Sequence, residues 1–538
     1  MSEAIKNLIL EKIELIKNRK DLEVIKRAFC KEYKIDSITN AQILNVYRMM
    51  LRAKEINRVI DFEKVLRKRS IRTMSGIAPV AVLTKSYPCP GECAYCPREE
   101  DVPVSYLSNE PAVMRAIRCS YNPYKQVIWR LQALENNGHE PTKIEIIVIG
   151  GTWSYLPKKY KYWYILNCFK AANDYYKFKK KVLSTKNGVI SLNKINSPYK
   201  QNLSLIELKK ALSVEQKRNE KEHYKIIGLT LETRPDYINE EELKEMRDLG
   251  CTRIEVGVQA IDDKILQLNR RGHGVKEIAE ATELMKKYGF KITYHFMPAL
   301  PGSSPAKDLS MFKKLFSDRR FQPDQIKFYP TVVVEGSLLY KWYKQGDYKP
   351  YTDEELKNLI IKCKLIVPEY VRIIRLIRDI PGESIIAGNK ITNLRQIIKD
   401  KGVKCRCIRC REAKDSLLTD WHIKILEYKA SSGQEYFISA ESKDGNILYG
   451  FCRLRIDRAS PISPAIIREI HVYGQLTSVG ESGKVQHAGV GKKLLKEAEK
   501  IANKQKATSL AVISGVGVRD YYRKLGFKLK NTYLLKNL

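Results

Sequence analysis

Three cysteines stand close together in the stretch Cys-Pro-Gly-Glu-Cys-Ala-Tyr-Cys at residues 89–96. Cys89, Cys93 and Cys96 are too closely spaced for an ordinary disulfide framework, and cysteine thiolates at such spacing are typical ligands of an iron-sulfur cluster. A cube-shaped cluster has four irons, so three protein ligands leave one iron open. A structural zinc site is the alternative, because C-x2-C pairs also bind zinc. No second pair follows at zinc-finger spacing, which favours the cluster.

The spacing C-x3-C-x2-C, with Tyr95 before the last cysteine, resembles the radical S-adenosylmethionine (SAM) enzymes. This resemblance implies a 4Fe-4S cluster whose open iron is chelated by the amino and carboxylate groups of SAM. In such enzymes an electron from the cluster cleaves SAM to a 5'-deoxyadenosyl radical, while the protein orients and shields the cofactor. We therefore expect a radical SAM site around this loop.

The composition is that of a large, strongly basic globular protein. A chain of 538 residues, 43% of them hydrophobic, exceeds one hydrophobic core and predicts about two to four domains. We find no apolar run long enough for a bilayer and no apolar signal-peptide core, so we expect a cytoplasmic protein without membrane contact. The formal net charge of +36 favours nucleic acid as partner, although charge alone does not exclude an acidic membrane.

Residues 1–70 repeat apolar positions at helical spacing with lysine and arginine between them, which predicts a basic helical N-terminal region. Its final basic run suits phosphate contact, with a solvated helix face as the alternative. This run consists of Lys64, Arg67, Lys68, Arg69 and Arg72.

From residue 71 to 350 short apolar runs alternate with helical segments, which predicts an α/β fold with a parallel sheet. The number of strand-helix units indicates a radical SAM (β/α) partial barrel, with its active site at the carboxyl ends of the strands. The predicted strands are Ile144–Ile149, Ile226–Leu231, Arg253–Val258, Lys291–His295 and Gln325–Tyr329.

Candidate SAM-binding residues follow two of these strands. Gly150 and Gly151 lack side chains, so the backbone there can approach a ligand closely. The radical SAM resemblance assigns Gly150, Gly151 and Thr152 to the amino-carboxylate end of SAM. Glu232 and Arg234 come after the next strand and could reach SAM, with a plain ion pair as the alternative.

A lysine- and tyrosine-rich stretch covers residues 158–225 and predicts an elaborated helix with surface loops. Its tyrosines suit stacking on unpaired bases beside phosphate contacts, with packing on the barrel wall as the equal alternative. They are Tyr160, Tyr162, Tyr164, Tyr175 and Tyr176.

Residues 351–414 are predicted to form a linker with a zinc site. Cys405, Cys407 and Cys410 in C-x-C-x2-C can supply three thiolates to one tetrahedral zinc. The fourth ligand is missing locally, and Cys363 and His422 are the candidates by residue type. A second cluster or unligated thiols are the alternatives.

Residues 415–538 form the last predicted domain, with strands at Glu435–Ala440, Ile447–Leu454 and Ile467–Tyr473, a helix at Lys492–Asn503 and a strand at Leu510–Ile513. The turn Gln486-His-Ala-Gly-Val-Gly491 before the helix suits a pyrophosphate, because backbone N-H groups and the helix dipole favour an anion there. Its Q-x-x-G-x-G pattern, with Gly489 and Gly491, resembles motif A of the GNAT acetyltransferases, which bind acetyl-CoA.

The order of these parts resembles the family of Elongator catalytic subunits, of archaeal or bacterial type, along essentially the whole chain. Matching strings include Ile-Gly-Gly-Thr-Trp at 149–153, Glu-Thr-Arg-Pro-Asp-Tyr at 232–237, His-Val-Tyr-Gly at 471–474 and Ala-Val-Ile-Ser-Gly-Val-Gly at 511–517. The family implies an acyltransferase that modifies the wobble uridine of tRNA in the anticodon stem-loop, bound in part by the N-terminal region. In the chemistry it implies, a SAM-derived radical activates the methyl of acetyl-CoA, the carbon adds to C5 of uridine, and water releases CoA to leave 5-carboxymethyluridine.

The same resemblance assigns residues to acetyl-CoA. Lys143 and Tyr521 are implied as catalytic, Tyr521 through a hydroxyl near the thioester, and Tyr522 as a neighbour with packing as its alternative. The implied acetyl-CoA contacts are Lys143, Glu469, Ile470, His471, Val472, Val485, Gln486, His487 and Tyr521.

Two other functions remain at this point. A protein-lysine acetyltransferase would need a base for an amine, and Glu469 could serve. A non-catalytic tRNA-binding scaffold is the third hypothesis. The sequence leaves open whether the chain forms a homodimer or needs accessory subunits.

Overall fold

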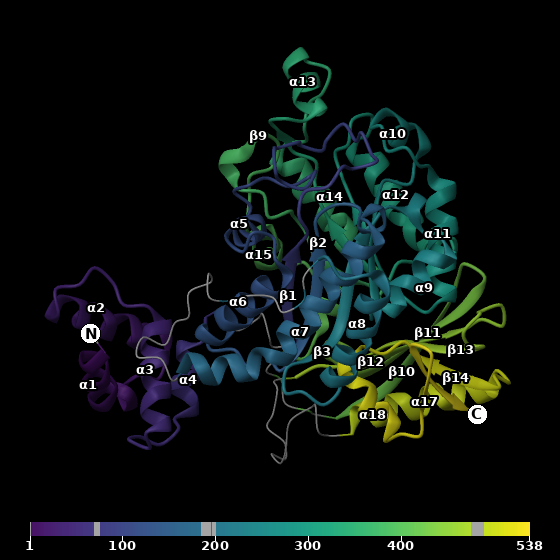
Figure 1. Cartoon of the computed structure of the whole chain (residues 1–538). Coiled ribbons are helices and arrows are strands. Elements are labelled where there is room, and N and C mark those ends of the chain that lie inside the picture. The colour runs from purple at the N-terminus through teal and green to yellow at the C-terminus, as the bar shows by residue number, and fades with distance from the viewer. Residues whose placement is uncertain are drawn as a thin grey trace.

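The computed structural model describes residues 2–68, 76–183, 195, 199, 201–414, 416, 418, 420–474 and 489–538, with only the backbone at 181–183. The chain begins with helices, continues through one seven-stranded sheet and ends in a second seven-stranded sheet (Figure 1). Within the described residues, no helix has both the length and the apolar character that a membrane span needs. Arg69 and Arg72 of the predicted phosphate-binding run lie outside the described residues.

The N-terminal region is helical, as predicted, and has a hydrophobic cluster of its own that includes Ile5, Phe29 and Tyr47. Its contacts with the rest of the chain include a hydrogen bond from Arg48 Nη1 to Glu135 O at 2.8 Å and an ion pair between Arg58 and Glu140 at 3.8 Å. Its helices are α1 (Ser2–Lys12), α2 (Arg19–Glu32), α3 (Asn40–Arg52) and α4 (Ile60–Leu66), with a 3-10 turn at Ile13–Leu15.

The central sheet is parallel throughout and ordered β1-β2-β3-β4-β5-β6-β8. Its strands are β1 (Ala78–Leu83), β2 (Lys143–Ile149), β3 (Lys225–Thr233), β4 (Arg253–Gln259), β5 (Lys291–Phe296), β6 (Gln325–Phe328) and β8 (Arg372–Arg375). β1 and β8 are the two ends of the sheet, so the barrel is open between them. The predicted partial barrel is confirmed, but β8 comes from the stretch predicted as linker.

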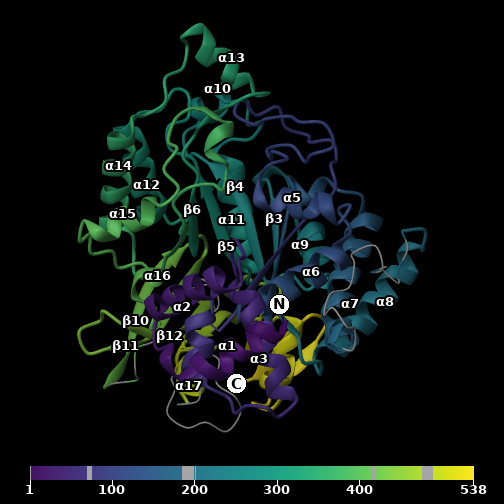
Figure 2. The same cartoon turned by 90° about the vertical axis from the view of Figure 1, so that its left-hand side faces the viewer.

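Helices surround this sheet, except that α13 projects away from it at the top of Figures 1 and 2. They are α5 (Pro111–Arg118), α6 (Pro123–Asn136), α7 (Lys158–Leu183), α8 (Leu205–Asn219), α9 (Glu240–Asp248), α10 (Asp263–Leu268), α11 (Val275–Lys287), α12 (Pro305–Ser317), α13 (Leu338–Gln345), α14 (Asp353–Ile366), α15 (Leu394–Asp400) and α16 (Ile408–Arg411). Shorter elements are the two-stranded sheet of β7 (Val333–Val334) and β9 (Ile385–Ala387), and the 3-10 turns η3 (Trp153–Tyr155), η5 (Pro235–Tyr237) and η6 (Gly382–Ser384).

The tyrosines of α7 pack against the barrel. Tyr160, Tyr162, Tyr164 and Tyr175 are buried in the main core, and only Tyr176 is exposed, at 43%. Stacking on unpaired bases is therefore wrong for the four buried tyrosines, and the packing alternative is correct. These large side chains face inward because removing the apolar surface of an aromatic ring from water stabilises the fold.

The second sheet lies below the barrel in Figure 1 and has the order β10-β11-β12-β13-β14-β16-β15. It is antiparallel except for the pair β13 and β14, which α17 (Val490–Lys504) connects in parallel. Its strands are β10 (Trp421–Ala430), β11 (Gly433–Ser442), β12 (Leu448–Ile456), β13 (Ala465–Val472), β14 (Ser509–Val512), β15 (Lys528–Lys530) and β16 (Tyr533–Asn537), and η8 (Val516–Val518) precedes α18 (Arg519–Arg523).

The second sheet contacts the amino ends of the barrel strands. Lys291 at the start of β5 pairs with Glu469 at 2.7 Å, and Arg372 at the start of β8 donates to Tyr473 Oη at 2.8 Å. Asp324, just before β6, pairs with Arg468 of β13 at 2.5 Å. Gly515 lies against the start of β3, where a Cβ would collide with Ile227 O. The two sheets are thus joined at the barrel edge opposite to its expected active site.

Candidate active sites

The cysteine loop lies at the carboxyl edge of the barrel, after β1. Ala94 fixes the loop from both sides, because its N-H donates to Asn269 O at 3.1 Å and its carbonyl accepts from Leu339 N at 2.7 Å. Among the described residues, three potential ligands gather within 4.8 Å only at Cys405, Cys407 and Cys410. The thiols of Cys89, Cys93 and Cys96 do not all lie within that distance of one another.

Buried polar atoms without a partner surround this loop. Tyr95 Oη, Arg234 Nη1, Gln259 Oε1 and Arg271 Nε have no hydrogen-bond partner among the described residues. Buried polar groups are nearly always paired in native proteins, so their concentration here indicates a polar or charged occupant. Cys93 also accepts a hydrogen bond from Arg271 Nη1 at 3.1 Å. This set, with donors on Tyr95, Arg234 and Arg271 and an acceptor on Gln259, fits an anionic iron-sulfur cluster together with SAM.

Arg234 is fixed in place beside the loop. Its Nε and Nη2 donate to the carboxylate of Asp236 at 3.0 and 2.9 Å, and Nη2 also donates to Arg271 O at 2.6 Å. A Cβ at residue 91 would overlap Arg234 Nη1, so only glycine fits there. Arg234 thus has an acidic partner, as the ion-pair alternative expects, and its Nη1 has no partner among the described residues.

Gly150 and Gly151 leave the end of β2 with φ values of +130° and +98°, where side chains are strained. A Cβ on Gly150 would collide with Thr84 Oγ1, whereas no atom of the described residues lies within 4 Å of a Cβ on Gly151. Thr152 follows as the N-cap of η3. Gly150 therefore serves close packing against β1, and Gly151 is the open backbone position to which a ligand has access.

Glu232, at the end of β3, belongs to a buried polar chain. Tyr106 Oη donates to its Oε2 at 3.2 Å, and His295 Nδ1 lies 3.5 Å from Oε1. His295 Nε2 in turn lies 3.0 Å from Glu255 Oε2. Arg378, from the stretch after β8, covers the ring of Tyr106 at 5.0 Å.

Sequence reasoning missed Tyr106, Arg271 and Arg378 as neighbours of this site. They come from three loops far apart in the chain, and no local pattern marks them. His295 ends a predicted strand. Its position at the carboxyl end of that strand was the one sequence signal that it lies near the active site.

Three residues implied for acetyl-CoA meet in the second sheet. A Cβ on Gly491 would lie 3.5 Å from both Tyr521 Oη and Val472 Cγ2, so α17, α18 and β13 converge there. Gly489 is the N-cap of α17 with φ +76°, and no described residue lies within 4 Å of a Cβ on it, the preceding residues 475–488 being outside the described part of the chain. Tyr521 is 41% exposed beside this open turn. The first turn of a fifteen-residue helix is thus presented to an anion.

Glu469 is held as a carboxylate by two cations. Lys291 Nζ lies 2.7 Å from Oε1 and Arg453 Nε lies 3.0 Å from Oε2. Burial alone would raise the pKa of Glu469, but the charges of Lys291 and Arg453 lower it to about 2. Such a carboxylate is a weak base. Ile470 is next to it on β13, where it pairs with Cys452 of β12.

The other implied residues are placed as follows. Burial lowers the pKa of His471 to about 4, so its ring is neutral, and it packs on Tyr473 with centroids 4.3 Å apart. Lys143 begins β2 at the amino edge, and burial lowers its pKa. Tyr522 is 7% exposed and packs edge-on against Phe527, which matches the packing alternative.

Val485, Gln486 and His487 lie outside the described residues.

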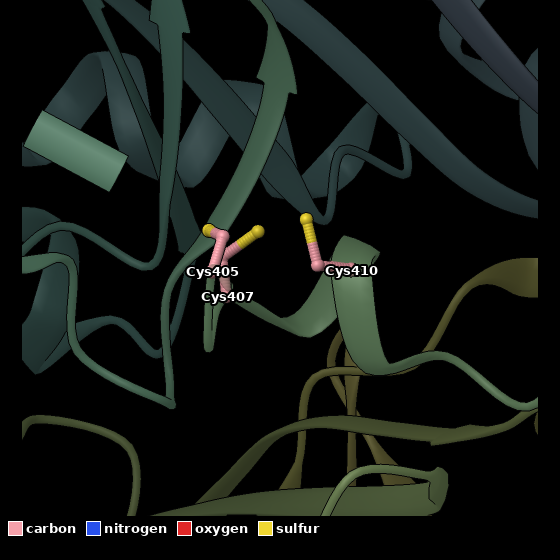
Figure 3. A group of neighbouring side chains, drawn as sticks. All are labelled: Cys405, Cys407 and Cys410. Atoms are coloured by element: carbon pink, nitrogen blue, oxygen red, sulfur yellow. The ribbon is translucent and has the colours of Figure 1, made fainter. Parts of the chain in front are cut away.

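The third candidate site consists of Cys405, Cys407 and Cys410, whose sulfur atoms all lie within 4.8 Å of one another (Figure 3). Tetrahedral zinc with Zn–S of 2.3 Å places its sulfurs about 3.8 Å apart, so one ion fits between these thiols. Neither Cys363 nor His422 belongs to the group. Lys364 Nζ lies 3.5 Å from Cys410 Sγ and would offset part of the thiolate charge.

Comparisons with known proteins agree with this layout. Residues 84–314 match the Radical SAM superfamily, and residues 323–402 match the Radical_SAM C-terminal domain. A "tRNA uridine(34) acetyltransferase" of Dehalococcoides mccartyi is 43% identical over 490 residues, covering 88% of this chain and 100% of the relative. The chain belongs to the tRNA uridine(34) acetyltransferase family.

This family includes proteins named Elongator complex protein 3. The human one is 36% identical and covers 88% of this chain and 86% of its own length. A solved structure of the archaeal Methanocaldococcus infernus protein, with an N-terminal deletion, is 36% identical with a TM-score of 0.70, covering 86% of this chain and 99% of that one. The predicted family, fold class and enzyme class are confirmed.

Proposed function

We propose that this protein modifies the wobble uridine, position 34, of tRNA to 5-carboxymethyluridine with acetyl-CoA as carbon source. The observation that carries the proposal is the match to a protein named tRNA uridine(34) acetyltransferase, which covers 88% of this chain and 100% of that relative. The four regions 1–70, 71–350, 351–414 and 415–538 remain our proposed division, with β8 of the third completing the barrel sheet.

Each site has residues for its proposed ligand. Once bound, the cluster and SAM would supply the radical that activates the acetyl methyl group for addition to C5 of uridine. Cys89, Cys93 and Cys96 would hold the cluster, while Gly151 and the free Nη1 of Arg234 would contact SAM. At the other site, the first turn of α17 would bind the CoA pyrophosphate.

Tyr521 is the proposed hydroxyl donor near the thioester, because its Oη lies beside the open turn at Gly491. Burial raises its pKa, so the phenol stays protonated at neutral pH. Lys143 is proposed to carry positive charge near CoA, and Tyr522 to support Tyr521, whose ring lies 5.1 Å away.

The net charge of +36 supports tRNA as substrate and predicts salt-sensitive binding through counterion release. We also propose zinc at Cys405, Cys407 and Cys410. The cysteine segment already lies against the start of β8, where Ile408 N donates to Val371 O at 2.9 Å. A zinc ion there would fix the segment before β10 in this position.

The protein-lysine acetyltransferase alternative depends on Glu469 as base. With two cations on its oxygens and a pKa of about 2, this carboxylate has little tendency to take a proton from an ammonium group. The contacts of Glu469 therefore favour tRNA modification, with Glu469 as a structural ion-pair partner.

The test is anaerobic incubation of reconstituted protein with tRNA, SAM and acetyl-CoA, followed by nucleoside mass spectrometry. We expect carboxymethylated uridine that disappears without SAM and in Cys93→Ala. Cys119→Ala, at a buried cysteine outside the candidate sites, is the matched control and should retain the product. If Cys93→Ala still formed the modified uridine, the radical mechanism would be wrong.

A further inference from the structure

Arg271 is a buried arginine without an acidic partner among the described residues. It is 4% exposed, its Nη1 donates to Cys93 Sγ at 3.1 Å, its Nη2 donates to Gly257 O, and its Nε has no partner. Arg253 and Arg468 are also buried but have acidic partners: Arg253 pairs with Glu145 at 3.1 Å and Arg468 with Asp324 at 2.5 Å.

An uncompensated guanidinium in the interior is strongly unfavourable, because desolvation of the charge is not offset by a counter-ion. The anionic group that Arg271 does contact is the thiolate of Cys93. A cluster with thiolate ligands is itself negatively charged, and its negative charge increases when it takes up an electron. The charge of Arg271 is therefore directed at the one group whose charge changes during the proposed reaction.

We propose that Arg271 sets the reduction potential of the iron-sulfur cluster, acting through Cys93. This inference rests on the proposed function, because it needs the cluster on the Cys89–Cys96 loop. The positive charge and the hydrogen bond both stabilise the reduced cluster more than the oxidised one, and hydrogen bonds to cluster sulfurs are a known control of potential. Arg271 is a positioning residue in this role, since it touches a ligand of the cluster.

The surrounding backbone holds Arg271 in this orientation. The loop after α10 pairs with the cysteine loop through Ala94 N and Asn269 O, at 3.1 Å, and Arg271 N donates to Leu266 O at 3.0 Å. Arg271 O also accepts from Arg234 Nη2 at 2.6 Å.

The neighbouring Arg234 differs in one respect that decides the assignment. Its charge is offset by Asp236 in a two-bond pair, whereas Arg271 keeps its full charge for the thiolate. Of the two arginines beside Cys93, Arg271 is therefore the one with the larger effect on the cluster.

The experiment is a redox titration of the reconstituted full-length protein, without SAM or tRNA, followed by electron paramagnetic resonance. For Arg271→Met we expect at least a tenfold lower ratio of reduced to oxidised cluster at a fixed potential, which is a midpoint about 59 mV more negative for one electron. Arg271→Lys keeps the charge without the planar geometry and should shift the midpoint in the same direction by less.

Arg247→Met is the matched control. Arg247 is equally buried and donates to two backbone carbonyls, Cys251 O and Thr532 O, at the amino edge of the barrel. It has no cysteine ligand of the cluster as partner, so its loss should leave the midpoint unchanged even if stability falls.

The outcomes separate the inference from the proposed function. If wild-type protein takes up no iron and sulfide, the proposed function fails and this inference with it. If the wild type holds a cluster and Arg271→Met has the same midpoint, only the inference is overturned. An unchanged midpoint with weakened SAM binding would make Arg271 a SAM ligand instead. Should Arg271→Met take up no cluster, Arg271→Lys carries the test, and a midpoint equal to wild type would refute the inference.

Discussion

Asp324→Asn should weaken the junction between the barrel and the second sheet more than any surface charge change. Asp324 is 0% exposed, and its carboxylate accepts from Arg468 Nη1 at 2.8 Å, from Arg468 Nη2 at 2.5 Å and from Ile292 N at 2.9 Å. Arg453 Nη1 is a further cation at 3.4 Å. The substitution keeps the shape but removes the charge that these arginines face.

The expected loss follows from burial. Removing one partner of a buried ion pair costs about 3–5 kcal/mol, which is an upper limit here because Arg468 keeps Glu435 at 3.0 Å and Arg453 keeps Glu469 at 3.0 Å. At about 2–4 °C per kcal/mol for units of this size, the unfolding temperature should fall on the order of 10 °C. Differential scanning calorimetry is the assay, and we expect the second sheet to unfold in a separate, earlier transition, because the arginines on β12 and β13 lose their anchor on the barrel.

Asp318→Asn is the matched control, since Asp318 forms a surface pair with Arg320 at 2.7 Å. Exposed pairs contribute about 0–1 kcal/mol, so its transition should shift by no more than a few degrees. Equal shifts in the two variants would refute the reasoning that the buried carboxylate ties the units together.

Three further outcomes are expected. Gly515→Ala places a Cβ against a backbone carbonyl of β3 and should cost about 1–3 kcal/mol by overpacking, measured by thermal unfolding, whereas Gly382→Ala, with nothing within 4 Å of its Cβ, should cost little. Glu469, with its pKa depressed to about 2, should contribute stability that is present above about pH 4.3 and is lost as pH falls towards 2; Glu469→Gln should remove this acid dependence in unfolding curves. Cys407→Ser should reduce bound zinc from about one per chain to none by atomic emission, while Cys30→Ser should retain it.

The central strands could be predicted because a buried parallel strand is a short apolar run. Ile144–Ile149 and Ile226–Leu231 fall within β2 and β3 for this reason. β8 could not be found in this way, because its sequence Arg-Ile-Ile-Arg is short and polar at both ends. Only its pairing with β6 makes it a strand, and pairing depends on tertiary structure.

The site was predictable only where one segment supplies several ligands. The motifs at 89–96 and 405–410 reveal chemistry because their cysteines are neighbours in sequence. Arg271 and Tyr106 act through contacts with residues more than a hundred positions away, at 3.1 and 3.2 Å, and nothing local distinguishes them from other arginines and tyrosines. The α7 tyrosines show the opposite problem. Their composition is typical of RNA contact, yet four of them are buried against the barrel.

The two candidate sites lie at opposite edges of the barrel, and this constrains how an acetyl group could serve both. Glu469 contacts the first residue of β5, whereas the cluster loop is at the carboxyl edge, and β5 with its 6 residues spans about 20 Å. Because Asp324 and Gly515 tie the second sheet to the amino edge, rotation of that sheet would break buried contacts.

The proposed function therefore requires that the acetyl group moves between the sites, rather than the second sheet. Glu255 of β4 contacts His295 of β5 and Lys327 of β6, two strands away, so buried charged side chains fill the concave face of the barrel. We infer that the acetyl group passes through the open side between β1 and β8, which leaves this packing intact. A covalent bridge across that opening should then abolish uridine modification and leave acetyl-CoA binding unchanged, whereas retained modification would require a path through the interior.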